Sequence, residues 1–98
     1  MESISAQELR SVIARQNPAI TVIDVREPSE YEEGHIEGAE NIPLGDIHKA
    51  AHDLADFDAV YLYCRSGGRS ALGCQILQGA GVPAVNLEGG YIAWQRLS

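Results

Sequence analysis

Apolar runs typical of buried strands alternate along the chain with amphipathic stretches typical of helices. The run at residues 20–25 is β-branched and almost continuously apolar, as in a strand covered on both faces. Strands are predicted at residues 20–25, 59–63 and 84–87, with at most one more short strand within residues 36–43. Helices are predicted at residues 6–16, 28–33, 44–55, 70–80 and 91–97. Strands separated by helices predict an α/β fold with a largely parallel sheet between helices.

The helix predicted at residues 70–80 follows a Gly-rich loop. Ser70 is a residue type that caps helices, so we expect it at the N-terminus. Ile76, Leu77 and Ala80 are expected on the buried face of this helix. Cys74 lies among apolar residues of the same helix, and a packing role is favoured for it.

Composition excludes several classes of protein. A chain of 98 residues predicts a single domain, residues 1–98. It has 14 acidic residues against 7 Lys and Arg, a net charge of −7, which disfavours nucleic-acid binding. No apolar run is long enough to span a membrane, and no secretory signal is apparent, so a cytoplasmic location is expected. Two cysteines exclude a disulfide scaffold and a Cys₄ zinc site.

Cys64 stands where a predicted strand gives way to a polar loop, the edge at which parallel sheets collect ligands. Gly67 and Gly68 free backbone N–H groups to surround an anion, and the next helix adds the positive end of its dipole. Arg65 and Arg69 add two positive charges. All three effects favour the thiolate, so Cys64 is a candidate nucleophile. The alternative is that Cys64 is a small buried apolar residue that only packs. A disulfide between Cys64 and Cys74 has no strong motif to support it.

Other polar side chains have weaker functional interpretations. Asp24 and Arg26 end the strand at residues 20–25, on the side where Cys64 is expected, and a supporting role is favoured over a catalytic one. His35 is expected to be a hydrogen-bonded turn residue and not a general base. His48 and His52 are four residues apart, but a solvated helix face is favoured over a metal site. The aromatic residues expected to pack are Tyr91 and Trp94 on the last helix, and Tyr61 and Tyr63 on opposite faces of their strand.

Four segments together resemble the rhodanese-like sulfurtransferase family over nearly the whole chain. They are Asp-Val-Arg-Glu with a following Glu-Tyr at residues 24–31, Gly-His-Ile-Glu-Gly-Ala-Glu-Asn-Ile-Pro at 34–43, Cys-Arg-Ser-Gly-Gly-Arg-Ser at 64–70, and Glu-Gly-Gly-Tyr-Ile-Ala-Trp at 88–94. The resemblance implies a five-stranded, mostly parallel sheet with helices on both faces.

The same resemblance implies a chemistry. Cys64 would carry sulfane sulfur as a persulfide, taken from thiosulfate or another persulfide donor and passed to cyanide or a thiol. The loop that would bind the substrate comprises Arg65, Ser66, Gly67, Gly68, Arg69 and Ser70. Neither a metal nor an organic cofactor is implied. A thioredoxin-like or other sulfur-acceptor protein is a possible partner.

Two rival functions share features of this sequence. Cdc25-type phosphatases and related arsenate reductases also place a cysteine in an arginine-containing loop, but that loop is one residue longer. Four residues separate Cys64 from Arg69, which favours a tighter cradle suited to one sulfur atom. The other rival is a sulfur-relay or interaction module for a protein partner. The sequence does not separate it from an enzyme, because both need the same persulfide.

Overall fold

The computed structural model describes residues 2–98 and contains one five-stranded sheet. Its strand order is β1-β5-β4-β2-β3, and every pair of neighbours is parallel. The strands are β1 (Ser3–Ile4), β2 (Ile20–Asp24), β3 (Glu40–Asn41), β4 (Ala59–Tyr63) and β5 (Ala84–Leu87). The predicted α/β fold with a parallel sheet is confirmed. β1 was not predicted, because two residues are too few to show a strand pattern.

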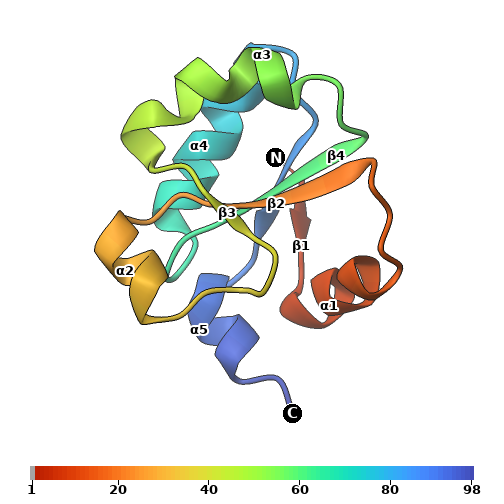
Figure 1. Cartoon of the computed structure of the whole chain (residues 1–98), viewed down its shortest axis with the longest axis vertical. Coiled ribbons are helices and arrows are strands. Elements are labelled where there is room, and N and C mark those ends of the chain that lie inside the picture. The colour runs from red at the N-terminus through yellow and green to blue at the C-terminus, as the bar shows by residue number, and fades with distance from the viewer. Residues whose placement is uncertain (1) are drawn as a thin grey trace.

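Helices cover both faces of the sheet (Figure 1). They are α1 (Ala6–Ala14), α2 (Pro28–Glu33), the 3₁₀ helix η1 (Leu44–Ala50), α3 (Ala51–Leu54), α4 (Gly68–Gly79) and α5 (Gly90–Gln95). One apolar cluster joins the sheet to α4, η1 and α3, and a second joins it to α1 and α5. The continuous helix predicted at residues 44–55 is therefore wrong, since this segment is a 3₁₀ helix followed by one short α-helical turn.

Alternation along the strands assigns side chains to the two clusters. Val60 and Leu62 of β4 face the cluster with α4, whereas Tyr61 and Tyr63 face the cluster with α1 and α5. The prediction that the two tyrosines point to opposite faces is wrong, because residues two apart on a strand share a face. Tyr63 is fully buried, and its hydroxyl accepts a hydrogen bond from the N–H of Ile36 at 3.0 Å.

The buried face of α4 differs from the prediction. Leu77 is fully buried, but Ile76 is 37% exposed and Ala80 is exposed as well. Gly73 lies on the buried face of α4 instead. It has no side chain, so Leu62 packs closely against it, and a Cβ at this position would lie 2.8 Å from the Leu62 side chain. The predicted packing role of Cys74 is confirmed, since it is fully buried in the apolar cluster.

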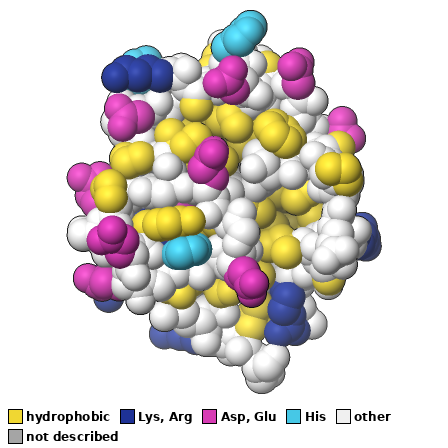
Figure 2. Space-filling view, viewed as in Figure 1, with side chains coloured by type: hydrophobic (Ala, Val, Ile, Leu, Met, Phe, Trp, Pro, Cys, Tyr) yellow, Lys and Arg dark blue, Asp and Glu magenta, His cyan; other side chains and the backbone are white. Residues whose placement is uncertain are grey.

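Charge on the surface follows the composition. Acidic side chains are spread over the face shown in Figure 2, and Lys and Arg side chains lie toward its margins. None of the helices in residues 2–98 combines the length and the apolar composition needed to cross a bilayer.

Candidate active site

Cys64 lies at the carboxyl end of β4, in the loop that leads into α4. Its side chain is almost completely buried, and its Sγ faces the first turn of that helix. The N–H of Gly67 donates to Sγ at 3.1 Å, and the N–H and hydroxyl of Ser70 both lie 3.4 Å away. Gly67 has a φ of 112°, a left-handed conformation that favours glycine and turns its N–H inward. The loop therefore surrounds one sulfur atom with hydrogen-bond donors.

These donors decide the ionisation of Cys64. Burial raises the pKa of a thiol, but the Ser70 hydroxyl and the backbone N–H groups of Ser70, Gly67 and Ser66 stabilise the thiolate. The donors outweigh burial, so the pKa of Cys64 lies below its ordinary value. Cys74 has no such donors, and burial alone raises its pKa to about 11. Both cysteines are free thiols, and Cys64 is the one with thiolate character.

Ser70 is not the N-cap of α4, contrary to the prediction. The helix begins at Gly68 with Gly67 as its N-cap, because the left-handed glycine lets the helix start two residues earlier. Ser70 is fully buried in the first turn, where its hydroxyl lies 2.6 Å from Oδ1 of Asn86 on β5. The amide of Asn86 also donates to the carbonyl of Gly67 at 3.4 Å. Asn86 thus connects Gly67 and Ser70, the two residues that donate to Sγ of Cys64, to the sheet.

The start of α5 holds the other side of the Cys64 loop. The N–H of Tyr91 donates to the carbonyl of Cys64 at 2.8 Å, and that of Ile92 donates to the carbonyl of Arg65 at 3.1 Å. Gly90 makes this approach possible, since a Cβ there would lie 2.5 Å from the Arg65 carbonyl oxygen. The Gly-Gly-Tyr segment therefore acts on the loop directly, through its backbone.

Arg69 is held by an acidic residue of α2. Its guanidinium donates two hydrogen bonds to the carboxylate of Glu30, at 2.7 and 3.0 Å. Arg69 lowers the pKa of Glu30 to about 2, so the pair is ionised at neutral pH. Arg65 is exposed and makes no ion pair within the described residues. The two arginines expected to add charge to the loop thus differ: Arg65 is available, whereas Arg69 is already neutralised.

Asp24 and Arg26 form a buried ion pair beside the loop. The shortest contact is 2.7 Å, and the side chains are 0% and 6% exposed. Arg26 also donates to the carbonyl of Gly34 at 2.6 Å, and its guanidinium lies 4.7 Å from the centre of the Tyr91 ring. The pair therefore joins the end of β2 to the end of α2 and to α5.

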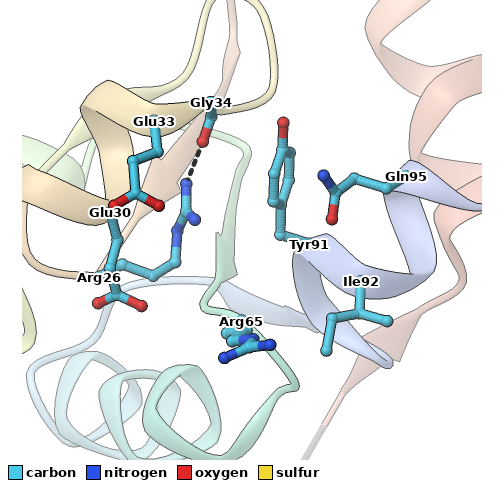
Figure 3. A pocket seen from close by; sticks show the side chains of 8 residues that line it. All are labelled: Arg26, Glu30, Glu33, Gly34, Arg65, Tyr91, Ile92 and Gln95. Carbon is cyan, nitrogen blue, oxygen red and sulfur yellow. Dashed lines mark hydrogen bonds between the residues drawn. The ribbon is translucent and has the colours of Figure 1, made fainter.

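A cavity of about 360 Å³ opens beside the loop, between α2 and α5. Figure 3 shows the guanidinium of Arg26 beside the ring of Tyr91, with Arg65 at the end where the Cys64 loop lies. Its lining residues are Arg26, Glu30, Glu33, Gly34, Arg65, Tyr91, Ile92 and Gln95. The cavity borders the Cys64 loop through Arg65.

The histidines lie apart from this arrangement. His35 is exposed, its Nδ1 is 2.9 Å from the carbonyl of Tyr31, and its ring stacks on Tyr31 at 3.7 Å. His35 is therefore a hydrogen-bonded turn residue, as predicted. His48 and His52 are exposed on η1 and α3. Among residues 2–98 no three His, Cys, Asp or Glu side chains gather as a metal site would require.

Three residues that contribute to the site were not predicted from the sequence to do so. Asn86 and Glu30 bind residues of the loop, and Gly90 admits α5 to it. Glu30 and Gly90 belonged to recognisable segments, but nothing local shows which loop residue each one contacts. For Asn86, a polar residue within a short apolar strand was the available signal, because buried amides need partners.

Comparisons with known proteins agree with this geometry. The family described as the rhodanese-like domain matches residues 5–97. A sulfurtransferase of Allochromatium vinosum is 37% identical over 79% of this chain and 73% of its own length. The crystal structure of SSP1007 from Staphylococcus saprophyticus has a TM-score of 0.87 at 41% identity, covering 96% of this chain and 93% of that one. The human single-domain sulfurtransferase TSTD1 has a TM-score of 0.86 at 26% identity, covering 100% and 99%.

The chain spans different shares of its curated relatives, from 24% to 91% of their length. Names among these relatives include the words sulfur carrier protein and adenylyltransferase/sulfurtransferase. Both the family match and the relatives cover most of this chain. The chain belongs to the rhodanese-like sulfurtransferase family.

Proposed function

We propose that this protein transfers sulfane sulfur through a persulfide on Cys64. The donor is thiosulfate or another small sulfane-sulfur compound, and the acceptor is cyanide or a thiol. The observation that carries this proposal is the set of donors around Sγ from Gly67 and Ser70, at 3.1 to 3.4 Å. Such donors stabilise a thiolate before the reaction and an anionic persulfide after it.

The reaction balances without a cofactor. The Cys64 thiolate attacks the outer sulfur of thiosulfate, so that an S–S bond to Sγ forms. The bond between the outer sulfur and the sulfonate breaks, and sulfite leaves with its electron pair. An acceptor thiolate or cyanide then attacks the terminal sulfur, and Cys64 leaves as a thiolate. Arg65 is exposed and lines the cavity, and in this proposal it binds the oxygens of the donor.

A protein acceptor is compatible with the same persulfide. Relatives that carry sulfur-carrier and adenylyltransferase/sulfurtransferase names support transfer to a protein acceptor. The short loop, with three residues between Cys64 and the start of α4, supports sulfur over phosphate, because its N–H groups converge on one sulfur atom.

The experiment that tests the proposal is mass spectrometry of the protein after thiosulfate treatment without reductant. We expect a mass increase of one sulfur atom on Cys64 and none on Cys74. Thiosulfate plus cyanide is expected to give thiocyanate, and Cys64→Ser is expected to abolish both results. The matched control is Cys74→Ala, which removes the other thiol and is expected to keep sulfur loading. Thiocyanate formation by Cys64→Ser would overturn the proposal.

A further inference from the structure

The cavity beside the Cys64 loop carries no excess of positive side-chain charge. Two arginines line it, Arg26 and Arg65, and so do two carboxylates, Glu30 and Glu33. Asp24 binds Arg26, and Glu30 binds Arg69. Glu33 lines the cavity and forms no ion pair within residues 2–98. A donor entering the cavity therefore meets one unpaired arginine and one unpaired carboxylate.

The Glu30–Arg69 pair matters most, because it uses the two parallel N–H groups with which an arginine binds an oxyanion. Two nitrogens of Arg69 contact the two carboxylate oxygens of Glu30, at 2.7 and 3.0 Å. A sulfonate group would need the same two nitrogens. Glu30 also lines the cavity, and its charge cancels the attraction that Arg69 would otherwise exert on an anionic donor. A donor with two negative charges loses about twice as much of this attraction as a donor with one.

We propose that Glu30 is a specificity-determining residue that makes the site favour singly charged sulfane-sulfur donors over dianionic thiosulfate. The inference rests on the proposed function, since it concerns the donor of the same cysteine. Glu30 acts in two ways: it occupies the two N–H groups with which Arg69 would bind an oxyanion, and its charge cancels the positive charge of Arg69. The backbone donors around Sγ are untouched by either effect, so they serve both kinds of donor equally.

The test compares two donors that differ by one charge. Thiosulfate is a dianion, and methanethiosulfonate is a monoanion in which a methyl group replaces one sulfonate oxygen. With methanethiosulfonate the same S–S bond to Sγ forms and methanesulfinate leaves with the electron pair. The ratio of kcat/KM for methanethiosulfonate to kcat/KM for thiosulfate is measured in the wild type and in Glu30→Gln. The glutamine oxygen can still accept the hydrogen bond that the N–H of Glu27 gives to Glu30.

We expect Glu30→Gln to lower this ratio about tenfold, through a lower KM for thiosulfate, because Arg69 is released and one negative charge is removed. Glu33→Gln is the matched control, a neighbouring carboxylate of the same cavity that does not bind Arg69, and it is expected to change the ratio much less. Glu30→Asp keeps the charge and is expected to stay close to the wild type. Thermal melting of each variant confirms that it is folded.

The outcomes separate the two proposals. If both donors load Cys64 and the ratio is the same in the wild type and Glu30→Gln, the inference is wrong and the proposed function stands. An equal shift in Glu33→Gln would also overturn the inference, because general charge in the cavity would then explain it. If neither donor loads Cys64 in a folded wild type, the proposed function is wrong, and the inference is wrong with it.

Discussion

Hydrogen bonds, and not arginine side chains, supply the main stabilisation of the Cys64 thiolate. The residue string from Cys64 to Ser70 allowed the thiolate loop to be predicted, because glycines, a helix start and a cysteine are all visible in the sequence. The sequence did not reveal that Glu30, 39 residues away along the chain, would neutralise Arg69. Local sequence therefore pointed to the candidate nucleophile, whereas the charge of its surroundings depends on contacts between distant elements.

Ser70 gives a direct test of the hydroxyl at the sulfur. Ser70→Ala removes the side-chain donor that does most to lower the pKa of Cys64, so the pKa of Cys64 is expected to rise. Iodoacetamide alkylation measured against pH should show its inflection at a higher pH than in the wild type. Ser66→Ala is the control, since Ser66 is exposed and acts through its backbone N–H. An unchanged inflection in Ser70→Ala would show that the backbone donors suffice.

The Glu30–Arg69 pair should also make stability depend on pH. Arg69 lowers the pKa of Glu30 from an ordinary value of 4.5 to about 2. A lowered carboxyl pKa stabilises the fold above pH 4.5, and this stabilisation is lost as the pH falls toward 2. Urea unfolding should show the wild type more stable than Glu30→Gln at pH 6, with the difference shrinking below pH 4.5. A constant difference across this range would contradict the pairing.

At the scale of elements, the site is assembled where β4, α4 and α5 meet. Strands β2, β4 and β5 were predicted to within one residue, because their apolar runs are distinct in the sequence. The role of α5 was not predictable, because its contact with the Cys64 loop runs through backbone groups. Any sequence that begins a helix at that place would present the same N–H groups. Gly90 is the residue whose identity reflects the contact, because a side chain there would meet the loop carbonyls.

Gly90→Ala should break this junction. Gly90 has a φ of 59°, and a Cβ there would lie 2.5 to 2.6 Å from the carbonyl groups of Arg65 and Cys64. We expect a loss of more than about 2 kcal/mol in the free energy of unfolding, together with slower sulfur loading of Cys64.

The matched control for Gly90 is Gly79→Ala at the end of α4. A Cβ at Gly79 meets no atom within 4 Å, and its φ is not positive. Since alanine favours helices, this variant is expected to be unchanged or stabilised by roughly 0.5 kcal/mol. Chemical denaturation measures both variants, and equal stability of the two would refute the steric argument.

At the scale of the whole molecule, the buried Asp24–Arg26 pair connects parts that are distant along the chain. Arg26 reaches Asp24 on β2, the carbonyl of Gly34 after α2 and the ring of Tyr91 on α5. The supporting role expected for the two residues agrees with these contacts. The sequence did not establish that Asp24 and Arg26 pair with each other. Side chains two residues apart at the end of a strand can turn in several directions.

Removing one partner of this pair should be costly. Asp24→Ala leaves the Arg26 guanidinium buried without its carboxylate, and we expect a loss of about 3–5 kcal/mol in the free energy of unfolding. Asp46→Ala is the control, because its 3.6 Å contact with Lys49 joins two side chains that are 58% and 72% exposed. The control is expected to change stability by less than about 1 kcal/mol. Similar losses in both variants would contradict the importance of burial.

The contact between α5 and the Cys64 loop also sets an order of events during synthesis. The ribosome makes Cys64 well before it makes Tyr91 and Ile92, whose N–H groups bind the carbonyls of Cys64 and Arg65. Until α5 has been made and has folded against the sheet, the loop lacks the hydrogen bonds that α5 donates to it. The loop around Cys64 therefore reaches its final form only after a helix that is synthesised later than the loop itself.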